Sequence, residues 1–196
     1  MSSQLALGLE WTAVVLNILF TILIGLEKRS GWLFGFVASV ISVVLYQAQD
    51  AWLMALLNVF YGFMGLYGWW AWGSASEDRP LTRFPLPKHL LLLAIGVAVT
   101  GLLVWAMRYW QVPGTHQGME AFIASFAIIA TWLMSAKAVE NWIYWTIGDV
   151  VAVAFNFLIG LNGYALLNVV YIGLAVAGYI RWNRAYNARL KPQAIP

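Results

Sequence analysis

The stretch ALLNVFY at residues 55–61 returns as ALLNVVY at residues 165–171, an offset of 110 with six of seven positions identical. Three more pairs fall at the same offset: Trp32 with Trp142, Gly68 with Gly178 and Trp72 with Trp182. Two apolar helices often look alike by composition alone, but a shared Asn, a shared Tyr and these Trp and Gly pairs favour a true internal repeat. The chain is therefore expected to contain two copies of one helical unit.

The composition predicts that these helices span a membrane. Hydrophobic residues make up 62% of the 196 positions and charged residues only 10%, and the mean hydropathy is +0.75. A soluble domain of this length buries only about two-thirds of its surface, so much of this apolar content would face water. We therefore expect an all-α integral membrane protein in a lipid bilayer.

Seven stretches approach the length of about 17 to 25 residues that a membrane span needs. The predicted spans are Glu10–Leu26, Gly31–Gln47, Trp52–Trp72, His89–Tyr109, Glu120–Ala136, Asn141–Gly160 and Tyr164–Arg181. The repeat equates spans 1–3 with spans 5–7, so the two halves have the same topology. The predicted organisation is a first three-helix repeat (1–72), a polar cytoplasmic loop with linker helix 4 (73–110), a second three-helix repeat (111–185) and a cytoplasmic tail (186–196).

The basic residues predict the orientation. Ten of the eleven Lys and Arg residues fall on the side of the C-terminus, and only Arg108 lies opposite. The positive-inside rule then places the N-terminus outside and the C-terminus in the cytoplasm.

Parallel repeats are typical of transporters, whose substrate binds near the midplane between the halves. A site for an asymmetric ligand should lie where the halves differ, and two such differences are Gly35 against Trp145 and Ser39 against Asp149. Four residues of span 6 share one helical face at spacings of 3, 4 and 7, namely Trp142, Trp145, Asp149 and Asn156.

Asp149 lies about 12 Å into its span. A carboxylate there costs at least ~2.5 kcal/mol, and no Lys or Arg is predicted at that depth to pair with it. Three interpretations stay open: a structural carboxyl bonded to Ser, Tyr or Asn of other helices, a direct or water-mediated contact with a cationic substrate, and proton coupling. We favour the second, with Trp145 lining the cavity beside it.

Four further polar candidates are related by the repeat: Asn58 and Tyr61 on span 3, and Asn168 and Tyr171 on span 7. They either bridge helices within each half or face the axis and reach the substrate. Tryptophans near predicted span ends, including Trp72 and Trp182, are expected to form an aromatic belt at the membrane interface.

The stretch Val139-Glu140-Asn141-Trp142-Ile143-Tyr144-Trp145 resembles the WxxW region of the PnuC family of vitamin transporters. Leu26-Glu27-Lys28, Tyr46-Gln47-Ala48-Gln49 and Tyr67-Gly68-Trp69-Trp70-Ala71-Trp72 are similar to that family as well. The resemblance extends from about Gly25 to Trp182. It implies a seven-helix, SWEET-like 3+1+3 fold, a homotrimer, and uptake of a water-soluble B vitamin by facilitated diffusion, with trapping by a separate kinase.

The resemblance also implies roles for single residues. Trp142 and Trp145 match substrate-stacking positions, and Gln47 and Asn58 lie in pocket-lining regions. Gly65 and Asp149 stand where the nicotinamide riboside members have asparagine, which favours the thiamine-transporting PnuT branch, with nicotinamide riboside as the alternative. Both vitamins are cations. Gly65, Ser39 and Asn156 are the candidate specificity residues.

Two other classes of function remain as alternatives. One is the substrate-binding subunit of an ATP-driven vitamin uptake complex, because such subunits are also small and helical. The other is an intramembrane enzyme, but no hydrolase or metalloprotease motif occurs and His89 and His116 fall at span ends. Without cysteine and with two histidines, the chain is expected to hold no metal and no cofactor and to have no catalytic residue. A scattered net charge of +3 does not indicate a nucleic-acid partner.

Overall fold

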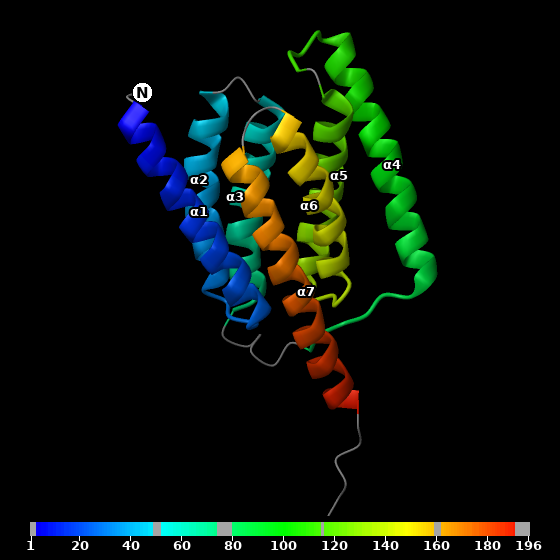
Figure 1. Cartoon of the computed structure of the whole chain (residues 1–196). Coiled ribbons are helices and arrows are strands. Elements are labelled where there is room, and N and C mark those ends of the chain that lie inside the picture. Colours follow the sequence, from blue (N-terminus) through cyan, green and yellow to red (C-terminus); the bar gives the residue numbers. More distant parts are fainter. Residues whose placement is uncertain (1–2, 49–51, 74–79, 115, 159–161, 191–196) are drawn as a thin grey trace, which may run out of the picture.

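A computed structural model describes residues 3–48, 52–73, 80–114, 116–158 and 162–190 of the chain. These residues form seven helices (Figure 1): α1 (Ser3–Gly25), α2 (Gly31–Gln47), α3 (Trp52–Ala71), α4 (Leu86–Tyr109), α5 (Gln117–Ser135), α6 (Asn141–Leu158) and α7 (Asn162–Leu190).

The predicted spans agree with these helices in number and order, and most boundaries differ by three residues or fewer. Two helices are longer than predicted. α1 begins seven residues before Glu10, and α7 continues nine residues past Arg181, so residues 186–190 of the predicted tail are helical. The polar end of α7 was not predicted because it carries too many Arg and Asn residues to resemble a span.

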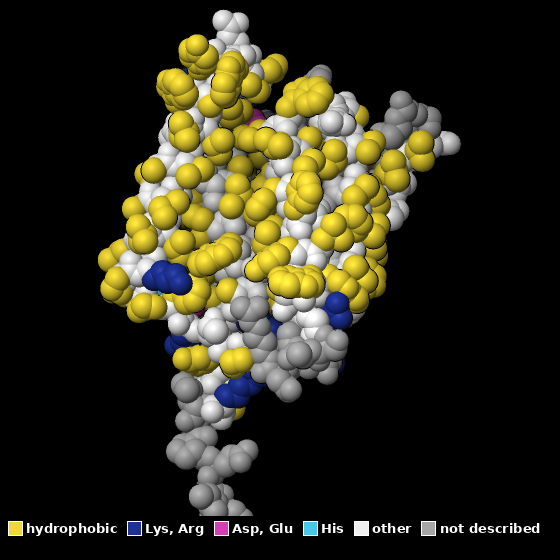
Figure 2. All heavy atoms as spheres, turned by 180° about the vertical axis from the view of Figure 1, so that it is seen from behind, with side chains coloured by type: hydrophobic (Ala, Val, Ile, Leu, Met, Phe, Trp, Pro, Cys, Tyr) yellow, Lys and Arg dark blue, Asp and Glu magenta, His cyan; other side chains and the backbone are white. Residues whose placement is uncertain are grey.

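The outside of the bundle is apolar, as a lipid-facing surface requires. Figure 2 shows hydrophobic side chains over most of the visible face, with the visible Lys and Arg side chains toward one end. Four helices contain stretches long and apolar enough to cross a membrane: Leu7–Gly25, Leu86–Tyr109, Gln117–Ser135 and Tyr164–Arg189. We call the end of the bundle that carries Arg29, Arg83, Lys88, Lys137 and Arg189 the basic end.

The helices pack in two groups of three. α2 packs against α1 and α3, and α6 packs against α5 and α7, while α4 lies outside the bundle against α5 (Figure 1). The two groups meet in two places, where α1 contacts α7 and where α3 contacts α5. The predicted repeat maps one of these contacts onto the other. This arrangement supports the proposal of two parallel repeats joined by α4.

Finer details also recur at the offset of 110. The turn after α1 and the turn after α5 each place a non-glycine residue in the left-handed region, Glu27 at φ 58° and Lys137 at φ 52°. Buried and exposed positions follow each other in the same order along residues 61–70 and 171–180. The sequence repeat is thus a repeat of local structure as well.

Four tryptophans related by the repeat form a buried cluster, with each side chain 1% exposed or less: Trp32, Trp72, Trp142 and Trp182. Trp32 meets Trp72 edge-on with ring centroids 5.7 Å apart, and Trp142 meets Trp182 in the same way at 5.3 Å. The prediction that Trp72 and Trp182 belong to an interfacial belt is therefore wrong. Both rings turn toward the bundle axis, where partner rings bury them.

Gly178 is required because the ring of Trp142 lies against its backbone. A Cβ at this position would stand 2.6 Å from Cε2 of Trp142. We expect Gly178→Ala to destabilise the protein by about 1–2 kcal/mol, the usual cost of overpacking a core. Thermal unfolding in detergent would measure it. Gly173→Ala, on the same helix but with no atom within 4 Å of the added Cβ, should leave the unfolding temperature unchanged or raise it; equal losses in both variants would contradict the steric argument.

Candidate functional site

A cavity of about 200 Å³ lies between the two groups of helices. It has room for several water molecules or for one small organic molecule. Its walls come from α1, α2 and α3 on one side and from α5, α6 and α7 on the other. Thirteen residues of α1–α3 line the cavity, and for twelve of them the residue 110 positions later lines it as well. The cavity therefore lies on the axis that relates the two groups.

Asp149 lines this cavity from α6 and is 7% exposed. Its repeat counterpart Ser39 lines the opposite wall, where the hydroxyl donates to the carbonyl of Gly35 at 2.8 Å. The ion pairs among the described residues do not include Asp149. A buried carboxylate without a cationic partner favours a cationic ligand, because such a ligand offsets the cost of taking the charge out of water.

Trp145 lies one turn before Asp149 on the same face of α6. Its ring is half-buried and tilted against Tyr61 of α3, with ring centroids 6.1 Å apart. The indole Nε1 is buried and has no hydrogen-bond partner within the described structure. Since Trp145 lines the cavity, its ring offers a stacking surface and its N–H is available to a ligand.

Asn58 and Asn168 occupy equivalent places on α3 and α7. Each side-chain amide donates to the carbonyl four residues earlier, Asn58 to Met54 at 2.9 Å and Asn168 to Tyr164 at 2.7 Å. Neither bond joins two helices, so these bonds do not support the helix-bridging interpretation. Both residues line the cavity, where their amide oxygens can accept a hydrogen bond from a ligand.

The structure brings most of the predicted site together. Seven of the eight predicted substrate-binding residues line the cavity: Trp142, Trp145, Asp149, Asn58, Asn168, Tyr171 and Tyr61. The three candidate specificity residues, Gly65, Ser39 and Asn156, line it too. Gln47 does not. It is exposed at the last turn of α2, while the adjacent Tyr46 points into the cavity. Successive residues of an α-helix point in directions about 100° apart, so Gln47 does not face the cavity that Tyr46 lines.

Trp142 differs from Trp145 in its accessibility. It is 1% exposed and packed edge-on against Trp182, so it contributes to the floor of the cavity at the basic end. A ligand can reach the half-buried Trp145 more readily than Trp142.

Gly65 lines the cavity where α3 crosses α2 closely. A Cβ at this position would stand 3.0 Å from Cβ and 3.2 Å from Cα of Phe36. A larger residue, such as asparagine, would need the two helices to move apart. Glycine at this position thus allows α2 and α3 to pack closely, and it leaves no side chain for recognising the ligand.

The sequence reasoning missed several lining residues. Asn17 and Thr21 come from α1, Thr131 from α5 and Tyr164 from α7. The polar residues inside a predicted span were a usable signal, because lipid-facing positions rarely carry Asn. The repeat was a second signal, since Thr21 and Thr131 are counterparts that each donate to the carbonyl four residues earlier.

Comparisons with known proteins identify the family to which the chain belongs. A family model described as nicotinamide mononucleotide transporter matches residues 7–184. The nicotinamide riboside transporter PnuC of Escherichia coli strain K12 is 30% identical over 89% of this chain and 85% of its own length. The riboflavin/roseoflavin transporter RibM of Streptomyces davaonensis is 27% identical over 83% and 78%. A crystal structure of the vitamin B3 transporter PnuC superposes with a TM-score of 0.78, covers 92% of this chain and 82% of that one, and is 19% identical.

Proposed function

We propose that this chain, which belongs to the nicotinamide mononucleotide transporter family that includes the PnuC proteins, carries nicotinamide riboside across the inner membrane of a bacterium. Uptake would proceed by facilitated diffusion, and phosphorylation by a separate kinase would trap the vitamin inside. Two relatives are named as transporters of nicotinamide riboside and of riboflavin or roseoflavin, and each of these molecules contains a flat ring. A central cavity between two groups of helices is where such transporters bind their substrate.

The observation that carries the proposal is the pairing of Asp149 with Trp145 in one small cavity. Nicotinamide riboside contains a pyridinium ring, which is flat and carries a permanent positive charge. A tryptophan face attracts such a ring, and a desolvated carboxylate nearby strengthens binding of the cation. The asparagine and tyrosine side chains of α3 and α7 then provide hydrogen bonds for the ribose and carboxamide.

Thiamine is the second candidate, and the relatives named above favour it less than nicotinamide riboside. Asp149 and Gly65 are the observations that keep it open. The carboxylate suits a thiazolium as well as a pyridinium, and Gly65 provides no amide for recognising a ribose or carboxamide.

Titration calorimetry on the purified protein tests the choice of substrate. We expect nicotinamide riboside to bind and to compete with thiamine, and riboflavin, which is neutral and larger, to bind at least tenfold more weakly. Binding of thiamine alone would overturn the substrate but leave the cation site in place. Tight binding of riboflavin alone would contradict the role given to Asp149.

Three other features belong to the same proposal. The basic end faces the cytoplasm, so that the C-terminus lies inside, as the distribution of Lys and Arg predicts. The protein is a homotrimer, and no ion is coupled to transport. Protease protection of terminal tags in oriented vesicles, mass measurement in detergent, and uptake without an ion gradient test these features in turn.

A further inference from the structure

We propose that the ion pair between Glu27 and Lys137 is the latch of a gate that closes the basic end of the cavity. The pair joins the two groups of helices directly below the cavity floor, and it must break for a solute to leave there. This inference rests on the proposed function only for the identity of the solute. The closing itself depends on contacts between the two groups of helices.

The path from the cavity to the basic end is blocked by the tryptophan cluster. Gly65 and Ala175 line the cavity, and Trp72 and Trp182 lie seven residues further along the chain, about 10 Å toward the basic end. The rings of Trp72 and Trp182 meet across the axis with centroids 6.3 Å apart, and both side chains are 1% exposed or less. A solute cannot pass unless these two rings separate.

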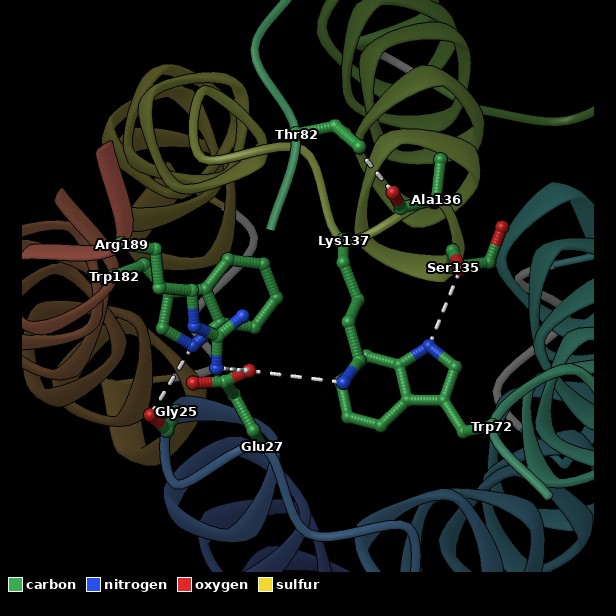
Figure 3. Close-up of polar contacts among 9 residues, drawn as sticks. All are labelled: Gly25, Glu27, Trp72, Thr82, Ser135, Ala136, Lys137, Trp182 and Arg189. Atoms are coloured by element: carbon green, nitrogen blue, oxygen red, sulfur yellow. Dashed lines mark hydrogen bonds and ion pairs between the residues drawn. The ribbon is translucent and has the colours of Figure 1, made fainter. Parts of the chain in front are cut away.

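Two equivalent hydrogen bonds hold the rings in this position, and each joins one group of helices to the other (Figure 3). Trp72 donates its Nε1–H to the carbonyl of Ser135 at 3.2 Å, and Trp182 donates to the carbonyl of Gly25, also at 3.2 Å. The two donors are 110 positions apart, and so are the two acceptors. The two bonds are therefore one contact repeated by the symmetry. Either bond is lost when the groups move apart at this end.

The ion pair of the latch lies beside the rings of Trp72 and Trp182 (Figure 3). Lys137 Nζ lies 3.6 Å from Oε2 of Glu27, and Arg189 Nη2 lies 3.5 Å from the same oxygen. Lys137 is almost fully buried, with its side chain 1% exposed, and its ammonium also lies 4.7 Å from the ring centre of Trp72. The repeat places opposite charges at counterpart positions, so the two left-handed turns attract each other across the axis.

The Lys137 side of the latch has a restraint of its own. The turn around Lys137 is held by the segment before α4: Thr82 N donates to the carbonyl of Lys137 at 3.0 Å, and Val139 N donates to the carbonyl of Thr82 at 3.0 Å. Thr82 Oγ1 also donates to the carbonyl of Ala136 at 3.1 Å. Glu27, on the α1–α2 turn, therefore separates from Lys137 when α1–α3 move away as a group.

The charges make the closed state depend on the pair. In the closed state Lys137 is out of water, and the carboxylate of Glu27 offsets part of the cost of burying its charge. In the open state water solvates both groups. Removing the carboxylate alone takes away this compensation in the closed state, so it should favour opening.

Thiol labelling tests the latch without any vitamin. The chain has no cysteine, so Met134→Cys places a single thiol on the cavity floor, where Met134 is 2% exposed. A membrane-impermeant cationic methanethiosulfonate is added from the side of the basic end, in vesicles sorted by a protease-sensitive C-terminal tag. We expect Glu27→Gln to speed labelling about tenfold, equivalent to 1.4 kcal/mol of conformational free energy. Labelling from the opposite side should not speed up.

Two companion variants separate a latch from a merely structural ion pair. Lys137→Gln, which removes the buried charge and leaves Glu27 beside Arg189, should speed labelling less than Glu27→Gln, and the double variant should resemble Lys137→Gln. Glu140→Gln breaks the 3.7 Å contact with Arg83 at the same end, which does not join the two groups of helices, so labelling should stay unchanged.

Glu27→Gln protein that keeps its unfolding temperature but labels at the original rate would overturn the latch. If that variant fails to fold, an unchanged rate in Lys137→Gln protein would do so. Failure of vitamin binding would bear on the proposed function alone.

Discussion

Asp149→Asn should weaken binding of nicotinamide riboside by about 2 kcal/mol, or ~30-fold in Kd. Asparagine keeps the size of the side chain and its hydrogen-bonding capacity but removes the negative charge from a site that is 7% exposed. In such a poorly hydrated place a carboxylate attracts a cation more strongly than it would at the surface. Calorimetry on the purified variant measures the loss directly.

A matched ligand separates charge from shape in this experiment. Dihydronicotinamide riboside has the same ribose and carboxamide but an uncharged ring, so Asp149→Asn should change its affinity less than threefold. Ser39→Ala is the matched variant, because Ser39 lines the opposite wall at the counterpart position and already donates to Gly35. Equal losses for the charged and uncharged ligands would remove the electrostatic role of Asp149 and leave a hydrogen-bonding one.

The fold could be predicted well from sequence because the repeat preserves unusual contacts rather than average composition. Trp142 needs glycine at 178, as its ring lies where a Cβ would stand, and the Trp32 ring lies against Gly68 in the same way. Such pairs are rare enough to be recognised at one offset. The length of α7 could not be predicted, since its last turns leave the apolar stretch and hydropathy does not distinguish a polar helix from a loop.

The centre of the site was predicted from positions where the two halves differ. Asp149 and Trp145 stand against Ser39 and Gly35, so the comparison of halves identified them. The burial of Trp72 and Trp182 was not predicted, because a tryptophan near the end of a span can face lipid or the axis, and helix rotation decides which. Lys137 was counted only for orientation, and Glu27 was used only in the resemblance to the PnuC family. Their opposite charges at counterpart positions were the signal that a contact across the axis should exist.

Trp145→Ala should weaken binding of nicotinamide riboside by about 2–3 kcal/mol, from 30-fold to more than 100-fold in Kd. The variant loses the ring on which the pyridinium stacks, together with the attraction of that ring for a cation and an indole N–H that has no partner among the described residues. Trp145→Phe keeps a stacking surface and should lose about 1 kcal/mol, which calorimetry resolves from the alanine variant. Trp105→Ala is the control, since this tryptophan of α4 is 59% exposed and outside the cavity lining, and its Kd should equal that of the unmodified protein. If the alanine and phenylalanine variants bind as the unmodified protein does, the ligand does not stack on Trp145, and the more deeply buried Trp142 becomes the ring to test.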